Sequence, residues 1–266
     1  MYSTSPTPKR AKRGFSLVEL SIVLVILGLL VGGVLSGQSL IRAAELRSVN
    51  ADYSRYVAAV HSFRDKYFSL PGDMTNATSF WNAAHATPAT CVTTASTDAR
   101  TCNGNGDGQV ARDFETWRAW QQLANAGLIE GRFSGVQGSL GAYDHDRGVN
   151  APASKISNTT WGFYYMNHAG DGAHYRWNYE NTFAIGVETS AQGAPEESFL
   201  KPEEAWNIDT KFDDGRPGTG KVFALNGGGA GFNNVVSCTT STSNTDYTGT
   251  YRLTQNNVRC SLYLGM

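Results

Sequence analysis

A long uncharged segment near the start of the chain is the feature that most limits its fold. The segment runs from Leu20 to Ile41, and its 22 residues are enough to cross the hydrocarbon core of a bilayer as one helix. Four basic residues precede it: Lys9, Arg10, Lys12 and Arg13. Because Lys and Arg favour the cytoplasmic side of a membrane, we expect residues 1–13 to stay in the cytoplasm while the rest of the chain crosses.

A single carboxylate, Glu19, stands directly before this segment. An ionisable group inside a spanning helix costs roughly 2.5–3.5 kcal/mol at the bilayer centre and less near an end, so it usually has a partner. No Lys or Arg lies three or four residues further along the expected helix. A simple single-pass anchor therefore leaves Glu19 unexplained.

The residues around this acid form a specific motif. The stretch KRGFSLVE at residues 12–19, followed by the apolar segment, resembles the N-terminus of type IV pilins and of the pseudopilins of type II secretion. The resemblance is close over residues 9–40 and continues in outline to about residue 70. It implies that a prepilin peptidase cuts between Gly14 and Phe15 and methylates the new amine of Phe15. It also implies that Glu19 neutralises the amine of a neighbouring subunit, which would supply the missing partner.

The same resemblance implies a structural subunit rather than an enzyme. The precursor would lie in the bacterial inner membrane with its head in the periplasm, and the mature chain would join a homo-oligomeric filament at the cell surface or in the periplasm. Its expected partners are prepilin peptidase, other pilins or pseudopilins and an inner-membrane assembly platform. The expected domains are a leader over residues 1–14, a long helix over 15–70, membrane-spanning in its first part, and an exported head over 71–266. The alternative is an uncleaved, membrane-tethered, calcium-dependent adhesin or binding protein.

The residue pattern predicts an α+β fold, with a long N-terminal helix packed on a globular head that contains an antiparallel β-sheet. Apolar and aromatic residues recur at three- and four-residue spacing from Leu46 to Leu70, which predicts one buried helix face, and Pro71 ends the pattern. A coiled-coil dimer is the competing explanation of this stripe. Further helices are expected at residues 112–126 and 202–209, and residues 72–104 read as a long loop. Short β-branched and aromatic segments predict strands at residues 161–166, 175–179, 183–188, 221–226, 234–238 and 258–264.

Charge and cysteine content agree with an exported protein. The chain has 22 Lys and Arg against 23 Asp and Glu, and removal of the four bases in the leader leaves 18 against 23. This mildly acidic balance does not suggest nucleic acid as the main partner. Four cysteines suit an oxidising compartment and allow three pairings. The short intervals favour Cys91–Cys102 and Cys238–Cys260; free thiols or a zinc site are the alternatives, although no C-x-x-C pair occurs.

A stretch of alternating oxygen donors predicts calcium binding. Asn103, Asn105 and Asp107 stand at alternate positions before Gly108, as in positions 1, 3, 5 and 6 of an EF-hand-like loop. Two further candidate ligands are Gln109 and Glu115, although Glu115 comes one residue after the usual position 12. Asp98 or Asp113 is a candidate for the missing charge. The alternative is a Gly-Asn turn that is pinned by Cys102.

Two other groups of titratable residues are weaker candidates. An acidic turn at residues 209–215 could hold a cation, but ion pairs of its carboxylates with Lys211 and Arg216 are the favoured explanation. A second set could form a metal site only if it converged on one cavity, and solvated loop positions are the favoured explanation: His145, His168, Asp171 and His174. No nucleophile elbow, P-loop or G-x-G-x-x-G motif is present, so we do not expect an enzyme.

Overall fold

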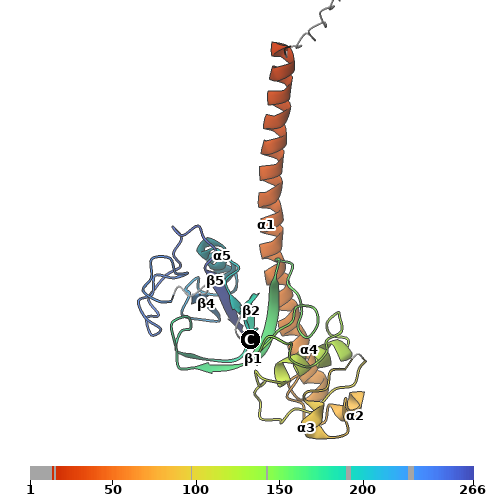
Figure 1. Ribbon diagram of the computed structural model, residues 1–266. Coiled ribbons are helices and arrows are strands. Elements are labelled where there is room, and N and C mark those ends of the chain that lie inside the picture. Colours follow the sequence, from red (N-terminus) through yellow and green to blue (C-terminus); the bar gives the residue numbers. More distant parts are fainter. Residues whose placement is uncertain (1–13, 15, 97, 142, 190–192, 227–230) are drawn as a thin grey trace, which may run out of the picture. The chain divides into compact units, whose positions relative to one another are not determined.

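The structure is a computed structural model, and it describes residues 14, 16–96, 98–141, 143–189, 193–226 and 231–266. The chain divides into two compact units, with the boundary between Ala44 and Glu45. One long helix, α1 (Leu17–Tyr67), contributes residues to both units (Figure 1). The expected long N-terminal helix is therefore present, and it begins and ends within a few residues of the predicted limits.

The first unit consists of the early turns of α1. This part of the helix is long and apolar enough to cross a membrane by length and composition, and none of its most apolar stretch is buried. Large apolar side chains from Leu17 to Ile41 are between half and nine-tenths exposed. A surface of this kind is consistent with contact to lipid or to other protein, because exposed apolar patches on soluble monomers rarely exceed a few hundred Å².

The second unit encloses the later turns of α1 in a hydrophobic core. The face of α1 that is buried there consists of Val49, Tyr53, Tyr56, Ala59, Val60 and Phe63. The ring of Tyr56 packs edge-on against Trp120 and Trp161, with centroids 5.0 and 5.4 Å apart. Packing under the head, rather than a coiled coil, therefore accounts for the aromatic stripe.

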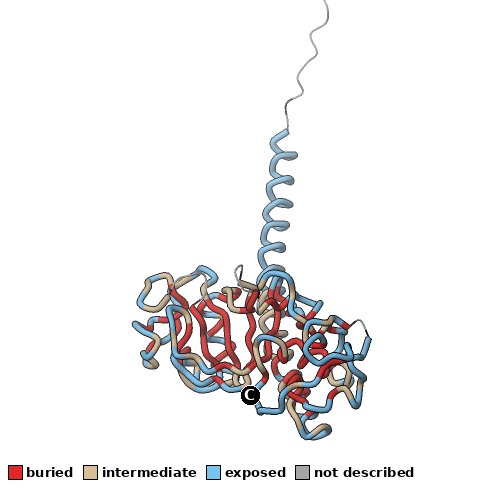
Figure 2. The backbone as a smooth tube through the Cα atoms, turned by 60° about the horizontal axis from the view of Figure 1, so that its bottom comes forward, coloured by how far each residue is buried: buried red, intermediate tan, exposed pale blue. Residues whose placement is uncertain are grey.

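Five strands form one sheet in the order β1-β2-β5-β4, with β3 paired to β2. The strands are β1 (Thr159–His168), β2 (Trp177–Glu188), β3 (Pro195–Glu197), β4 (Val222–Asn226) and β5 (Cys260–Gly265). Every pairing is antiparallel. The strands are largely buried (Figure 2), although the first residues of β2 are mostly exposed. The α+β head with an antiparallel sheet is thus confirmed.

Alternate residues of β1, β2, β4 and β5 enter two different cores. Phe183 of β2 and Leu262 of β5 belong to the main cluster, together with the α1 face, α4 (Glu115–Asn125) and α5 (Pro202–Phe212). On the opposite face, Tyr263 packs in a second cluster that loop residues cover. Because side chains of a strand alternate between faces, this arrangement buries both sides of the sheet.

Three local predictions were wrong. The segments expected as separate strands at 175–179 and 183–188 form the single strand β2, with an irregularity where Glu180 has φ +54°. Residues 234–238 form a turn, because Asn234 accepts hydrogen bonds from Val236 and Ser237. The expected loop at 72–104 contains the short helices α2 (Thr78–Trp81) and α3 (Pro88–Cys91).

Both expected disulfides are formed. Cys91 is bonded to Cys102, with 5.9 Å between their Cα atoms, and Cys238 is bonded to Cys260, with 5.1 Å. The first closes the loop that contains α3, and the second ties the turn after β4 to β5. The alternatives of free thiols and a zinc site are thereby excluded for these four residues.

Candidate functional site

The N-terminal motif forms the first turn of α1. The N–H of Ser16 donates to Oε2 of Glu19 at 2.8 Å, and the N–H of Val18 donates to Oγ of Ser16 at 3.3 Å. The N–H of Leu20 donates to the carbonyl of Ser16, which closes the first helical turn. A serine followed three residues later by a glutamate is the pattern of a capping box, in which each side chain satisfies a backbone donor that the helix leaves free.

Glu19 therefore has a partner within its own chain, which the search for a nearby cation missed. The signal for it was present as Ser16-x-x-Glu19. Glu19 is exposed, and among the described residues its other oxygen, Oε1, accepts no hydrogen bond. The carboxylate thus caps the helix with one oxygen and leaves the second accessible to another donor.

Gly14, the residue before the proposed cleavage position, is accessible. Gly14 is exposed, and a Cβ added there would meet no atom within 4 Å. Phe15 lies outside the described residues, so the geometry of the Gly14–Phe15 bond stays a prediction. A side chain at residue 14 has no steric conflict with the described part of the chain.

The predicted calcium loop is organised around an acid that the sequence analysis did not include, Asp73. Its carboxylate accepts hydrogen bonds from the N–H groups of Gly106, Asp107 and Gly108 at 2.6, 3.1 and 2.9 Å. Asp73 is almost fully buried. Burial raises the pKa of its carboxyl above the ordinary value, although the three N–H donors oppose this effect.

Four of the five expected ligands accept backbone donors as well, whereas no hydrogen bond to the side chain of Gln109 is formed among the described residues. Asn103 accepts from the N–H of Thr78, Asn105 from that of Asp107, and Asp107 from that of Gln109. The buried carboxylate of Glu115 accepts from Asn105 and from Ala111. These contacts make the segment a hydrogen-bonded turn, as in the alternative to a calcium loop, but Asp73 holds it in addition to the disulfide of Cys102. Calcium binding stays a prediction.

Charge nevertheless accumulates around this loop. Burial, followed by the neighbouring charges of Asp73 and Asp107, raises the pKa of Glu115 to about 7 despite two backbone donors. Three carboxylates therefore lie near one another without a cationic side chain bonded to them among the described residues. A divalent cation would relieve this repulsion, but the hydrogen bonds show no single point on which the loop oxygens converge.

The acidic turn after α5 is held by backbone groups. Asp209 is buried and accepts from the hydroxyl of Tyr251 at 2.8 Å and from the N–H of Gly215 at 3.1 Å. Asp213 accepts from the N–H groups of Lys221 and Val222, and Asp214 from that of Arg216. In the described part of the chain, the expected side-chain ion pairs with Lys211 and Arg216 are not formed. The carboxylates instead cap the turn.

Two of the histidines, His145 and His174, are buried, so the prediction of solvated loop positions was wrong for them. His145 is fully buried; its Nδ1 donates to the carbonyl of Tyr143, and Thr116 lies 3.1 Å from its Nε2. Burial lowers the pKa of His145 to about 4. His145 is therefore a neutral core residue at physiological pH.

His168, Asp171 and His174 do converge, with ligand atoms within 4.8 Å of one another. Nδ1 of His174 lies 3.0 Å from Asp171, and its Nε2 lies 3.7 Å from Glu196. Burial opposes the charged form of His174, but these two carboxylates raise its pKa to about 9. Nδ1 of His168 accepts from the N–H of Gly170, which leaves the ring proton on Nε2, facing Asp171 at 3.5 Å. Because both histidines present N–H groups to Asp171, the arrangement fits an ion-pair network rather than a metal site.

Comparisons with known proteins give one match. A family described as the prokaryotic N-terminal methylation motif matches residues 9–35. Comparison with curated proteins and with solved structures gives no match. The matched residues include the Ser16–Glu19 cap and the first exposed turns of α1. The chain therefore carries the prepilin-type signal that marks the precursors of type IV pilins and pseudopilins.

Proposed function

We propose that the chain is the precursor of a structural filament subunit, a pilin or pseudopilin, which a prepilin peptidase cuts after Gly14 and which polymerises through α1. The observation that carries this proposal is the continuity between the methylation motif at residues 9–35 and an exposed apolar helix. That helix surface suits lipid before assembly and other subunits afterwards.

The glycines of α1 support close helix contacts in such a polymer. A Cβ added at four positions would meet no atom of the chain within 4 Å: Gly28, Gly32, Gly33 and Gly37. Glycine in a helix costs about 1 kcal/mol relative to alanine, so an internal packing role would be the ordinary compensation. The described residues provide no such packing. Small residues at four-residue spacing allow neighbouring helices to approach closely, which fits contacts between copies.

The free oxygen of Glu19 supports the proposed pairing with a neighbouring amine. One carboxylate oxygen caps the helix, and the second is open to a donor from another subunit. An incoming amine would otherwise be an unpaired charge in a surrounding of low dielectric constant, where its cost is highest. Two disulfides in the head agree with an oxidising periplasm.

The mass of the N-terminus tests this proposal. The full chain is purified from cells that contain a prepilin peptidase and from cells that lack it. A start at methylated Phe15 only when the peptidase is present supports the filament subunit. Retention of residue 1 in both strains favours the uncleaved, membrane-tethered adhesin instead.

Substitution at Gly14 gives the matched control. Gly14→Glu should accumulate as full-length precursor, whereas Gly14→Ala should be processed to a measurable extent. Because an added Cβ at residue 14 contacts nothing in the described chain, a defect reports on the peptidase rather than on folding. Normal processing of Gly14→Glu contradicts the proposed cleavage.

A further inference from the structure

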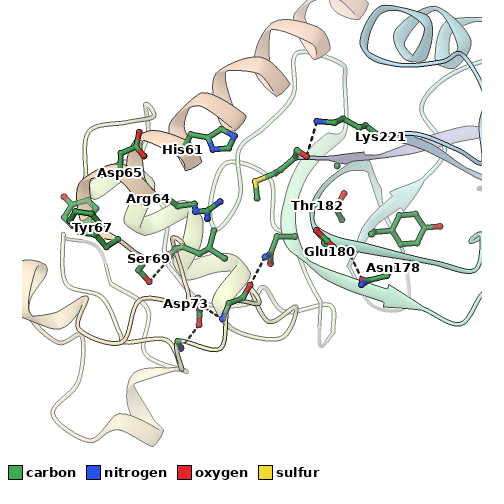
Figure 3. A pocket seen from close by; sticks show the side chains of 18 of the residues that line it. His61, Arg64, Asp65, Tyr67, Ser69, Asp73, Asn178, Glu180, Thr182 and Lys221 are labelled. Carbon is green, nitrogen blue, oxygen red and sulfur yellow. Dashed lines mark hydrogen bonds between the residues drawn. The ribbon is translucent and has the colours of Figure 1, made fainter.

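A groove of about 1440 Å³ lies in the second unit, between the last turns of α1 and the first half of β2 (Figure 3). His61, Arg64 and Phe68 lie on the helix side, and Trp177 and Glu180 lie on the strand side. Pockets for drug-sized ligands usually measure roughly 300–1,000 Å³. The groove therefore has room for a ligand made of several units.

Unusual backbone conformations occur on both walls of the groove. Five described residues other than glycine have positive φ, and three of them are asparagines, which tolerate this region: Asn82, Asn158 and Asn233. The remaining two are Phe68, with φ +55°, and Glu180, with φ +54°, and both line the groove. For such residues this conformation costs roughly 1–2 kcal/mol. Strain of this kind concentrates at functional sites.

Two of the aromatic side chains that line the groove are exposed. Phe68 is 94% exposed, and Trp177 is 44% exposed. The ring of Trp177 lies against Phe223, with centroids 5.6 Å apart, which supports it from one side. Flat apolar surfaces next to polar groups suit a ligand that itself has an apolar face and a polar rim.

Four of the titratable side chains that line the groove have no partner within the described part of the chain, whereas Asp73 and Lys221 are hydrogen-bonded. His61, Arg64, Asp65 and Glu180 are exposed, and their side chains form no hydrogen bond or ion pair there. Arg64 is a cationic hydrogen-bond donor, and Asp65 and Glu180 are anionic acceptors. A polyanion such as nucleic acid would meet three carboxylates, those of Asp65, Asp73 and Glu180. A ligand with many hydroxyl groups could instead use all four of the side chains that have no partner.

The shape of β2 disfavours the other extended ligand, a peptide strand. β5 pairs with β2 only from Thr182 to Ile185. On the side of β2 that faces β5, residues 177–181 are therefore not paired with β5. A peptide normally binds such an edge by adding a regular ladder of backbone hydrogen bonds. The irregularity at Glu180 interrupts that regular spacing, and bulges of this kind protect edges from strand addition.

We propose that this groove binds a neutral oligosaccharide, whose apolar ring faces stack on Phe68 and Trp177 and whose hydroxyls hydrogen-bond to Arg64, Asn178 and Glu180. The side chain of Asn178 accepts a hydrogen bond from the N–H of Glu180 at 3.2 Å, which helps to hold the backbone of β2 in its conformation along the groove. The proposal does not depend on the filament role, since every residue of the groove belongs to the second unit.

The test uses the full chain in a detergent that has no sugar headgroup. Maltohexaose, cellohexaose and chitohexaose are titrated separately, and binding is followed by calorimetry. At least one hexaose should bind saturably, and Trp177→Ala should weaken it by about 3- to 10-fold, the equivalent of ~0.5–1.5 kcal/mol per aromatic contact. Trp206→Ala is the matched control, because Trp206 is 38% exposed and lies on α5, outside the groove.

Variants at Glu180 separate binding from folding. Glu180→Gly should raise the melting temperature, because glycine adopts positive φ freely, and should weaken hexaose binding. Glu180→Gln keeps a hydrogen-bonding side chain and should retain more affinity than Glu180→Gly. Failure of all three hexaoses to bind, or wild-type affinity in Trp177→Ala, overturns the proposal. Saturable binding of an alternating Thr-Val octapeptide that requires Trp177, without hexaose binding, identifies the groove as a peptide site instead.

Discussion

The N–H of Ser16 donates a 2.8 Å hydrogen bond to the carboxylate of Glu19. The contact links the first residue before α1 to the acid that the methylation motif contains. Glu19 thereby has two separable properties: a hydrogen-bond acceptor that caps the helix, and an exposed carboxylate that we propose pairs with the amine of a neighbouring subunit.

Substitutions at these two residues should separate the two properties. Glu19→Gln keeps an acceptor for the cap, since glutamine also serves in capping boxes, but removes the charge. We expect Glu19→Gln and Glu19→Ala to be inserted and cleaved, yet to yield few filaments, because the neighbouring amine loses its counter-charge. Ser16→Ala should assemble nearly normally and weaken the helix start by about 1 kcal/mol.

The measurement compares sheared filaments with the processed subunit that remains in the membrane. Co-expression of Glu19→Gln with the unmodified chain should restore part of the yield, because each pair would need one intact carboxylate. Normal filament yield from Glu19→Gln alone would show that the cap, and not the charge, is the function of Glu19. Loss of cleavage in that variant would show that Glu19 is needed for processing by the peptidase rather than for assembly.

The buried carboxyl of Asp209 should make the head less stable as pH rises. Burial raises its pKa from 3.8 to about 7, so the folded state binds this proton more tightly than the unfolded state. The contribution of this group to stability is therefore greatest below pH 4 and is lost as pH rises toward 7. The full shift is equivalent to about 4 kcal/mol, and solvent screening reduces this, so Asp209→Asn should stabilise the chain at pH 8 by about 2 kcal/mol and change little at pH 4.

Thermal unfolding at both pH values checks this effect. The hydroxyl of Tyr251 and the N–H of Gly215 both face the carboxyl of Asp209. The amide in Asp209→Asn has one acceptor oxygen and one donor group, as the protonated carboxyl has, so it reproduces the hydrogen-bonding pattern of the low-pH form. Asp113→Asn is the control, because Asp113 is exposed. Equal stabilisation by Asp209→Asn at pH 4 and pH 8 would contradict the assigned titration.

Local patterns in the sequence were enough to predict the elements whose partners lie nearby. The stripe that starts at Leu46 predicted the buried face of α1, and short intervals predicted both disulfides. The cap at Glu19 also had a local signal, in Ser16 three residues earlier, which a search limited to cations overlooked.

Features that depend on distant residues had no comparable signal. The loop that was predicted to bind calcium wraps around Asp73, which lies 33 residues before Gly106. Although burial opposes the charged form, the pKa of His174 is raised to about 9 by Asp171, and also by Glu196, which comes from a separate strand. The positive φ values of Phe68 and Glu180 occur at residues that do not favour them, so no propensity predicts them. Tertiary contacts, rather than local preferences, determine these positions.

The disulfides should stabilise the head by similar amounts. The bridged cysteines are separated by 11 residues for Cys91–Cys102 and by 22 for Cys238–Cys260. Loop-closure entropy predicts a contribution of about 3 kcal/mol for each bond. Replacing either pair by alanine should lower the free energy of unfolding by this amount, measured by denaturant unfolding of the oxidised chain. Reduction of the unmodified chain should produce the combined loss, and no further loss should occur in a variant that lacks both pairs.

Calcium at the loop of residues 103–109 is the remaining prediction from the sequence. Asp73, Asp107 and Glu115 place three carboxylates around this loop, and their mutual repulsion contributes to the raised pKa of Glu115. A divalent cation that bound only the folded chain would stabilise it by mass action. For a Kd of about 10⁻³ M, as in weak extracellular sites, 10 mM calcium should add about 1.4 kcal/mol.

Melting curves of the full chain in 10 mM calcium and in chelator measure this effect. The increase in melting temperature should disappear in Asp107→Asn and in Asp73→Asn, which keep the size of each side chain but remove its charge. Asp113→Asn should retain the increase, because Asp113 is exposed and forms no hydrogen bond with the loop of residues 103–109 in the described part of the chain. Magnesium at the same concentration controls for ionic strength, since its smaller ion requires a stricter octahedral shell. Identical melting of the unmodified chain in calcium and chelator would leave the pinned turn around Asp73 as the structural role of this loop.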